Sequence, residues 1–212
     1  MAATVVTIAQ QKGGAGKTTV AAQLAVTYLR TGKSVALLDI DPQRSLTHWY
    51  ELRRESVGVE DESLLLREVS GWRISSELDR LRRSYDIVLI DSPPHAETDA
   101  KAAIRAGDLT LVPVQPSPVD LWATRATVEL AAGEKKPVLL VLNRMPPRGR
   151  LADAVRGQLA GDNLEVARTS LGNRVAYAAS LIEGRGVVES DPRTRAAEEI
   201  RALADEVMRV TA

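Results

Sequence analysis

The sequence predicts an α/β protein with a doubly wound, mostly parallel sheet and helices on both faces. Apolar runs rich in β-branched residues, such as TVVTIA (4–9), alternate along the chain with segments of helical period. These runs are apolar on both of their faces, which is typical of parallel strands buried between two layers of helices. No linker, repeat or low-complexity tract interrupts residues 1–212, so we expect one domain.

The expected elements follow one another in strand–helix order. A glycine-rich segment separates the first strand from a helix at about residues 16–29, which Thr31-Gly32 ends. Further strands are expected at 34–40, 85–91, 108–114, 137–143 and 164–171, and further helices at 45–54, 74–84, 96–105, 118–132, 150–160 and 193–210. Residues 58–71 fit neither pattern. Ligands of such sheets bind beyond the carboxyl ends of the strands, where the chemically distinctive residues of this chain fall.

The composition excludes several classes of function. The chain has no cysteine, which rules out disulfides and thiolate metal sites and suits a reducing cytoplasm. No run of about 18 apolar residues is present, so no membrane span is expected. The net charge is zero and aromatic residues make up only 3% of the chain. Nucleic-acid binding therefore needs a local basic patch rather than overall charge or base stacking.

The segment KGGAGKTT (12–19) lies between the first strand and the first helix. Small residues there let successive backbone N–H groups surround phosphate oxygens, and the positive end of the helix adds to the attraction. Lys17 is expected to reach the β- and γ-phosphates of ATP, the Thr18 hydroxyl to ligate Mg²⁺, and Thr19 to bond the α-phosphate. The expected ATP-binding residues of the loop are Lys12, Gly13, Gly14, Ala15, Gly16, Lys17, Thr18 and Thr19.

Three aspartates stand at the ends of predicted strands. Asp91 ends the apolar strand YDIVLID (85–91), the position of a carboxylate that holds Mg²⁺, often through water. Asp39 and Asp41 lie two residues apart in LLDIDPQRS, so strand alternation places both on the same side, near the phosphates. Aspartates also cap turns, and that structural role stays an alternative for this pair.

The glycine loop departs from the common P-loop pattern, because Gln11 and not glycine stands five residues before Gly16. The form KGGAGKTT resembles the deviant Walker A loop of the ParA/MinD family of P-loop ATPases. The segments DIDPQ, YDIVLIDSPP, LVPVQPS and VLNR then follow in the order and spacing of that family. The resemblance covers nearly the whole chain and is closest to small ParA-type partition and positioning ATPases.

The resemblance implies roles for residues that spacing alone leaves open. Lys12 corresponds to the lysine that crosses a dimer interface and contacts the phosphates bound by the other subunit. ATP binding and homodimer formation are then one event. Asp41 corresponds to the residue that positions or polarises the attacking water, so the expected catalytic residues of this slow ATPase are Lys12, Lys17 and Asp41.

The same resemblance completes the expected ligand sets. Mg²⁺ is expected to be held, partly through water, by Thr18, Asp39 and Asp91. Asn143, at the end of PVLLVLN, and Pro116, in VPVQPSPVDLW, are placed near the adenine. An asparagine at a strand end is also a common turn former, and that alternative stays open.

ParA proteins bind DNA without sequence preference through basic residues of their C-terminal half, once the ATP dimer unites two patches. Arg148, Arg150 and Arg174 are the expected DNA contacts here, since phosphate binding needs charge and no base readout. A solvated arginine face is the alternative. The resemblance further implies a ParB-like or cargo-adaptor partner that stimulates hydrolysis. It also implies a cytoplasmic, nucleoid-associated protein that partitions or positions a plasmid, a chromosome or a protein cargo.

Two other functions remain as alternatives. A membrane-cycling regulator of the MinD type ends in a basic amphipathic helix, whereas TRAAEEIRALADEVMRVTA carries four acidic residues and no lysine. We therefore expect this last helix to pack onto the domain. The less favoured alternative is a ligase similar to dethiobiotin synthetase, whose loop lacks the element formed here by Lys12 and the two glycines after it.

Overall fold

The computed structural model describes residues 3–58, 63–94, 97–147, 151–162 and 164–212. Within them seven strands form one sheet in the order β3-β2-β4-β1-β5-β6-β7, and every pairing between these strands is parallel. The strands are β1 (Thr4–Ile8), β2 (Val35–Asp39), β3 (Leu64–Glu68), β4 (Ile87–Asp91), β5 (Leu109–Val114), β6 (Val138–Met145) and β7 (Val166–Gly172). The predicted α/β class and doubly wound sheet are therefore confirmed.

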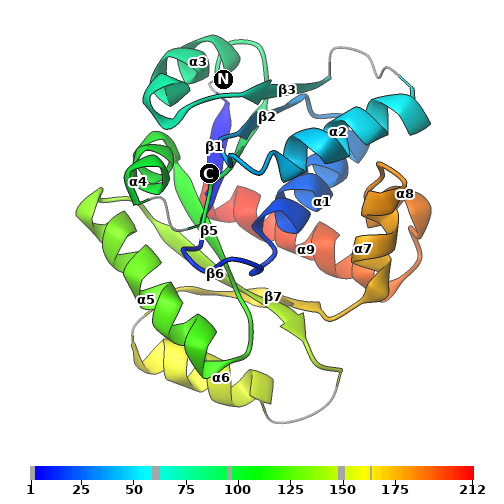
Figure 1. Cartoon of the computed structure of the whole chain (residues 1–212). Helices are drawn as coiled ribbons and strands as arrows, with labels where there is room; N and C mark the ends of the chain where they lie inside the picture. The colour runs from blue at the N-terminus through cyan, green and yellow to red at the C-terminus, as the bar shows by residue number, and fades with distance from the viewer. Residues whose placement is uncertain (1–2, 59–62, 95–96, 148–150, 163) are drawn as a thin grey trace.

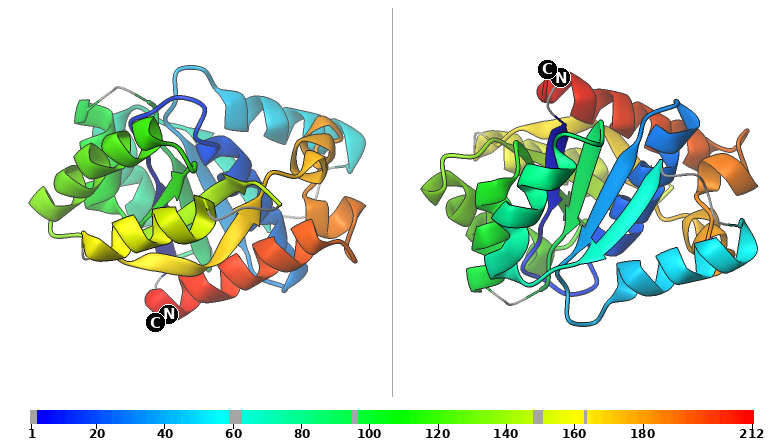
Figure 2. Two further views of the ribbon diagram at one scale, coloured as in Figure 1. Left: turned by 90° about the horizontal axis from the view of Figure 1, so that it is seen from below. Right: turned by 90° about the horizontal axis from the view of Figure 1, so that it is seen from above.

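Helices cover both faces of the sheet (Figures 1 and 2). One layer contains α1 (Lys17–Arg30), α2 (Ser45–Ser56), α7 (Val175–Ile182), the short α8 (Val187–Ser190) and α9 (Arg195–Val210). The other contains the turn η1 (Gly71–Arg73) and the helices α3 (Ile74–Leu81), α4 (Glu97–Ala106), α5 (Pro118–Gly133) and α6 (Leu151–Gly161). Alternate strand residues supply the two cores, because successive side chains point to opposite faces.

The alternation is visible within single strands. Val6 and Ile8 of β1 pack in the core beneath α1, whereas Val5 packs in the core on the side of α3. All three side chains are fully buried. A strand enclosed in this way needs apolar residues at consecutive positions, which is why the sequence shows continuous apolar runs rather than a polar–apolar alternation.

Two regions differ from the sequence expectations. Residues 58–71, which fitted no pattern, contain the edge strand β3 and the start of η1. The helices α7 and α8 were not predicted, because the segment between 172 and 193 is interrupted by Gly184 and Gly186 and offers only two short helical stretches. These two helices pack against α1 and α2, so contacts with the rest of the fold define them more than local propensity does.

Charged side chains form hydrogen bonds with backbone groups along the outer edge of β7, the last strand of the sheet. Glu206 of α9 accepts hydrogen bonds from the backbone N–H groups of Arg168 and Thr169, at 2.7 and 3.1 Å. From the other layer, Arg156 donates to the carbonyl oxygens of Ala167 and Arg168, at 2.8 and 3.0 Å. An edge strand with unpaired backbone groups invites pairing with another chain, and these contacts block it.

The last helix, α9, lies against the sheet with its apolar face inward. Ile200, Leu203 and Val207 are fully buried, which confirms the expectation that this helix packs onto the domain. In the described part of the chain, no helix is long and apolar enough to cross a membrane.

A buried arginine joins α2 to α8 and to the loop that precedes α8. Arg53, which is only 1% exposed, contacts Glu189 with both terminal nitrogens, at 2.8 and 2.9 Å, and donates to the carbonyl oxygen of Gly184. Gly184 has φ +66°, and a Cβ there would lie 2.5 Å from the Arg53 backbone. Only glycine combines this backbone conformation with so close an approach.

We therefore predict that Gly184→Ala lowers the free energy of unfolding by about 2–4 kcal/mol, because it adds both a left-handed alanine and a backbone clash. Urea denaturation measures this change. Gly133→Ala is the matched control, since a Cβ at Gly133, the last residue of α5, would meet nothing within 4 Å and φ there is not positive. Equal stability losses in the two variants would contradict the prediction.

Candidate functional site

The carboxyl ends of β1, β2 and β4 meet at one edge of the sheet. Asp91, the last residue of β4, is in register with Asp39 of β2 on one side and with Ile8 of β1 on the other. Residue 8 leads directly into the glycine loop. Parallel pairing therefore brings two predicted carboxylates and the loop together, although they are far apart in sequence.

The glycine loop is shaped by left-handed glycines and by side chains that hold its carbonyl groups. Gly14 has φ +77° and Gly16 has φ +94°, conformations that L side chains rarely adopt. Gln115 donates to the carbonyl oxygen of Gly14 at 2.6 Å, and Asn143 donates to that of Ala15 at 2.8 Å. Two carbonyl groups of the loop are thus bonded, and α1 starts at Lys17. The N–H groups of the loop and the N-terminus of α1 are therefore available to an anion.

Lys17 starts α1 with a side chain that is largely buried at the same edge. Burial lowers the pKa of its amine, and the nearby carboxylates of Asp91 and Asp41 act in the opposite direction. A buried cation between two carboxylates, at the open end of a glycine loop, is suited to hold phosphate oxygens.

Asp91 is fully buried, and one of its oxygens has no hydrogen-bond partner among the residues that the structure describes. The Thr18 hydroxyl donates to Oδ2 at 2.6 Å, whereas Oδ1 is unpaired. Burial raises the pKa of Asp91 to about 7, Asp39 adds to the rise, and Thr18 and Lys17 oppose it. A buried carboxylate beside a hydroxyl, with a free oxygen, fits a divalent cation that takes its other ligands from phosphate and water. Accordingly, no group of three His, Cys, Asp or Glu side chains in the described residues could hold a metal by itself.

Both carboxylate oxygens of Asp39 already accept hydrogen bonds from other groups of the protein. Its oxygens accept hydrogen bonds from the N–H of Asp41 at 3.1 Å, the N–H of Thr47 at 2.9 Å and the Thr47 hydroxyl at 2.8 Å. Asp39 thus orients the segment that carries Asp41 and fixes the start of α2. Burial raises the pKa of Asp39, and the bonds from Thr47 oppose that rise. A metal-binding role for Asp39 stays a prediction.

Asp41 begins a tight turn at the mouth of the loop. Its Oδ1 accepts from the N–H of Gln43 at 2.9 Å, and its carbonyl oxygen accepts from the N–H of Arg44 at 2.8 Å. The turn-capping alternative is therefore correct for part of this side chain. The side chain nevertheless lines a cavity of about 630 Å³, here named the P-loop cavity, together with Gly13, Gly14 and Lys17.

Lys12 does not line the P-loop cavity, although it precedes two residues that do. Its amine donates to Oδ2 of Asp120 in α5 at 2.6 Å, and the Ser117 hydroxyl contacts the same oxygen. Asp120 is 1% exposed, and within the described part of the chain its other oxygen is unpaired. Sequence reasoning missed Asp120, and the available signal was the helix start Ser-Pro-Val-Asp, in which Ser117 caps α5.

A second cavity of about 440 Å³, here named the β6–β7 cavity, opens beside Gly16 and Thr19. Asn143 and the residues after β7 line it, and α7 closes it with Tyr177 and Leu181. It is large enough for a nucleoside attached to phosphates at the loop. Pro116 is not among its lining residues; it precedes α5, whose first turn carries Asp120, the partner of Lys12. The adenine contacts of Asn143 and Pro116 stay predictions.

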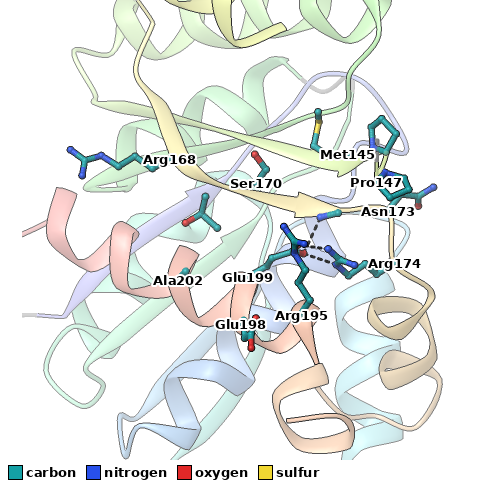
Figure 3. A pocket seen from close by; sticks show the side chains of 13 residues that line it. Met145, Pro147, Arg168, Ser170, Asn173, Arg174, Arg195, Glu198, Glu199 and Ala202 are labelled. Carbon is teal, nitrogen blue, oxygen red and sulfur yellow. Dashed lines mark hydrogen bonds and ion pairs between the residues drawn. The ribbon is translucent and has the colours of Figure 1, made fainter. Parts of the chain in front are cut away.

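The predicted DNA contacts are only partly described. Arg148 and Arg150 lie outside the described residues. Arg174 makes two bonds to Glu199, at 2.9 and 2.6 Å, and Figure 3 shows Glu199 between Arg174 and Arg195. This pairing raises the pKa of Arg174 and lowers that of Glu199, despite the burial of the carboxylate. Arg174 is therefore not a free cation in this structure.

Comparison with known proteins identifies the family. Residues 6–188 match the CobQ/CobB/MinD/ParA nucleotide binding domain, so the chain belongs to this family. The glycine loop, the buried Asp91 carboxylate at the end of the adjacent strand and the parallel sheet that joins them are consistent with membership of this family. The chain is an ATPase of this ParA/MinD group.

Two curated relatives cover almost the whole chain. Maintenance of carboxysome distribution protein A of Halothiobacillus neapolitanus is 31% identical over 95% of this chain and 94% of its own. The chromosome-partitioning ATPase Soj of Thermus thermophilus is 32% identical over 96% and 94%. Among solved structures, the septum site-determining protein MinD of Pyrococcus horikoshii, complexed with Mg-ADP, shares the fold with a TM-score of 0.79 at 22% identity, over 99% of each chain.

The raised pKa of Asp91 predicts how the stability of the nucleotide-free protein depends on pH. An unfolded aspartate has a pKa near 4, so between about pH 4 and 7 the folded protein retains a proton that the unfolded chain has lost. This carboxyl therefore lowers stability as the pH rises through that window. Asp91→Asn is expected to be more stable than the wild type at pH 8, by a margin that shrinks toward pH 4.

Urea denaturation in EDTA at several pH values measures this margin. Asp79→Asn, an exposed change on α3, is the control and should leave the pH dependence unaltered. If wild type and Asp91→Asn lost stability in parallel as the pH rose, the buried carboxylate would not be the cause.

Proposed function

We propose that this protein is an ATP-dependent dimerisation switch. ATP with Mg²⁺ binds at the glycine loop and joins two copies into a homodimer, and the dimer binds DNA without sequence preference. A ParB-like or cargo-adaptor partner then stimulates hydrolysis, which releases the copies. Repeated on the nucleoid in the cytoplasm, this cycle partitions or positions a cargo. The two relatives are named for carboxysome distribution and for chromosome partitioning, so the cargo class spans cellular bodies and DNA.

The position of Lys12 carries this proposal. Lys17 reaches into the P-loop cavity of its own chain, whereas Lys12 lies outside that cavity and is tethered to Asp120. The Lys12 side chain is 32% exposed, so a second copy facing the loop can reach it. A lysine that approaches the partner's phosphates has to leave Asp120 and exchange one carboxylate for several phosphate oxygens.

Exposed apolar side chains surround this face. Val119 and Trp122 flank Asp120 on α5 and are 55% and 64% exposed. On α7, Val175 and Ile182 are 83% and 76% exposed, and they line the β6–β7 cavity and the P-loop cavity respectively. Large apolar side chains in the open around a charged site are typical of a surface that another protein covers. They support a dimer formed across the nucleotide face.

The residues of the site suit slow hydrolysis. Thr18 and Asp91 would hold Mg²⁺, which when bound offsets charge on the phosphates. Lys17 and the loop N–H groups would orient the phosphates, and Asp41, already held by the turn and by Asp39, would position water at the mouth of the P-loop cavity. Positioning and charge are then the main contributions, and turnover depends on how well the Asp41 turn is placed.

DNA binding is proposed for the arginines of the C-terminal half. Arg148, Arg150 and Arg174 remain the candidates, and the structure adds Arg168, which is exposed and makes no side-chain hydrogen bond or ion pair within the described residues. The Arg168 side chain points away from Glu199 and its neighbours Arg174 and Arg195 (Figure 3). Because Arg174 is paired with Glu199, we expect it to contribute less to DNA binding than the other arginines.

The alternative functions receive less support. A MinD-type membrane cycle needs an apolar helix face that can enter a lipid surface, whereas Ile200, Leu203 and Val207 of α9 are fully buried and the helix packs against β7 and α1. A ligase of the dethiobiotin-synthetase type would leave Lys12 and its tether to Asp120 without a role. Binding to liposomes, or ATP turnover that requires a small acceptor, would favour these alternatives.

Lys12→Ala is expected to weaken ATP-dependent dimerisation about 10- to 100-fold, because one charge-assisted contact to phosphate is lost, while the monomer still binds nucleotide. Sedimentation velocity with a non-hydrolysable ATP analogue measures dimerisation, and a fluorescent analogue measures binding. Lys33→Ala, just before β2 and so at the amino ends of the strands, is the control for loss of a lysine. Full dimerisation of Lys12→Ala would exclude the intersubunit role.

Fluorescence anisotropy with random-sequence duplex DNA at low salt tests the DNA step. Binding is expected with ATP and Mg²⁺ but not with ADP, and it should weaken steeply as salt rises. Arg148→Ala combined with Arg150→Ala should reduce the slope of log affinity against log salt by about one unit per lost phosphate contact. Arg105→Ala on α4, whose side chain is paired with Glu134, is the control. If ATP drives dimer formation but the dimer does not bind DNA, the dimerisation switch is retained and the nucleoid-based function is excluded.

A further inference from the structure

A cavity of about 530 Å³, here named the arginine cavity, is lined by the end of β7 and the first turns of α9. Three of its lining residues are arginines, Arg168, Arg174 and Arg195, and two are glutamates, Glu198 and Glu199 (Figure 3). The arginines belong to the half of the chain for which DNA binding is proposed. The balance between arginines and glutamates therefore decides how strongly this face attracts a phosphate.

One of the two glutamates engages two of the three arginines. Oε1 of Glu199 accepts a hydrogen bond from a terminal nitrogen of Arg174 at 2.6 Å and lies 3.6 Å from Nε of Arg195, four residues earlier on α9. Oε2 accepts from Nε of Arg174 at 2.9 Å. Glu198 is exposed and makes no ion pair within the described residues. A single carboxylate thus binds both guanidinium groups that a phosphate would otherwise bind.

Uncharged groups hold the Glu199 carboxylate in this position. Oε2 also accepts from the backbone N–H of Gly172 at 3.0 Å and from the Tyr177 hydroxyl at 3.2 Å, and the side chain is only 13% exposed. A Cβ on Gly172 would lie 2.9 Å from Nε of Arg174, so the glycine leaves space for the guanidinium. Because its position is set before a ligand arrives, the carboxylate binds the arginines with little further loss of side-chain entropy.

We propose that Glu199 is an internal competitor for DNA phosphates, which keeps a single nucleotide-free copy from binding DNA. A phosphate has to displace the carboxylate from Arg174 and Arg195, so one copy gains little from these contacts. Two copies in a dimer present two arginine cavities to one duplex, and the second contact is then intramolecular. The competitor therefore makes DNA binding depend more steeply on dimer formation. The DNA step of this role rests on the proposed function, whereas the hold of Glu199 on the arginines does not.

The arginine cavity also adjoins the β6–β7 cavity, because Gly172, Asn173 and Arg174 line both. Tyr177, which donates to Glu199, lines the β6–β7 cavity as well. A nucleoside in that cavity would lie against two of the groups that bind the Glu199 carboxylate. Nucleotide binding would therefore act on the competitor directly, without a long pathway between the two sites.

Glu199→Gln tests this role, because glutamine has the same shape and its side-chain oxygen still accepts from Gly172 and Tyr177. Fluorescence anisotropy measures binding to random-sequence duplex DNA in EDTA without nucleotide. The variant is expected to bind about tenfold more tightly than the wild type. Its slope of log affinity against log salt should be steeper by about one unit for each arginine that gains a phosphate contact.

Two further variants show whether the gain comes from the released arginines. Glu198→Gln removes the same charge from the same helix and the same cavity, and it should leave the salt slope unchanged. Arg174→Ala, added to Glu199→Gln, should remove most of the gain in affinity. Urea denaturation checks that each variant folds. If Glu199→Gln does not fold, Glu199→Asp replaces it, because its shorter side chain weakens the pair with Arg174 and should give a smaller gain.

A folded Glu199→Gln that binds DNA no more tightly than the nucleotide-free wild type, while the wild type binds DNA with ATP, would overturn the competitor role. An equal gain in Glu198→Gln would also overturn it. Phenylglyoxal modification of Arg174, followed by mass spectrometry, needs no DNA and so separates this role from the proposed function. If ATP-bound wild-type dimers do not bind DNA, the proposed function fails. Faster modification of Arg174 in Glu199→Gln than in Glu198→Gln would still support the hold of Glu199, and equal rates would exclude it.

Discussion

The buried carboxylate of Asp91 is the constraint on which the phosphate site depends. It lies at the junction of three parallel strands with one oxygen unpaired, in surroundings that favour its neutral form. Such a group destabilises a fold unless a cation compensates it. Lys17 and Thr18 at the start of α1 provide part of that compensation, and a bound cation with nucleotide would provide the rest. We therefore expect nucleotide binding and local stability to be coupled at this carboxylate.

The remainder of the fold holds this junction rigid. Two layers of buried apolar side chains enclose β1, β2 and β4, and the glycine loop follows the carboxyl end of β1. Gln115 and Asn143 hold the loop carbonyls, so the loop depends on β5 and β6 as well as on its own glycines. On the far edge, carboxylates of α9 satisfy β7 and keep the sheet from extending into a second molecule.

Asp41 connects the site to the surface. Its N–H donates to Asp39, and its side chain lines both the P-loop cavity and a neighbouring cavity that Glu68 and Asp99 also line. Under the proposed function, a change at the phosphates would reach the protein surface through this one residue. Only a short turn, held by backbone hydrogen bonds and the pair of Arg44 with Glu68, has to move.

The sequence by itself determined the fold class, the glycine loop and the strand-end positions of Asp39 and Asp91. Continuous apolar runs, left-handed glycines and strand ends have local causes that a sequence displays. Tertiary structure alone decided that Asp120 holds Lys12, that Glu199 pairs with Arg174, that Pro116 does not line the β6–β7 cavity, and that α7 exists. The sequence does not display these contacts, because each joins segments that only the packing of helices on a parallel sheet brings within a few ångströms.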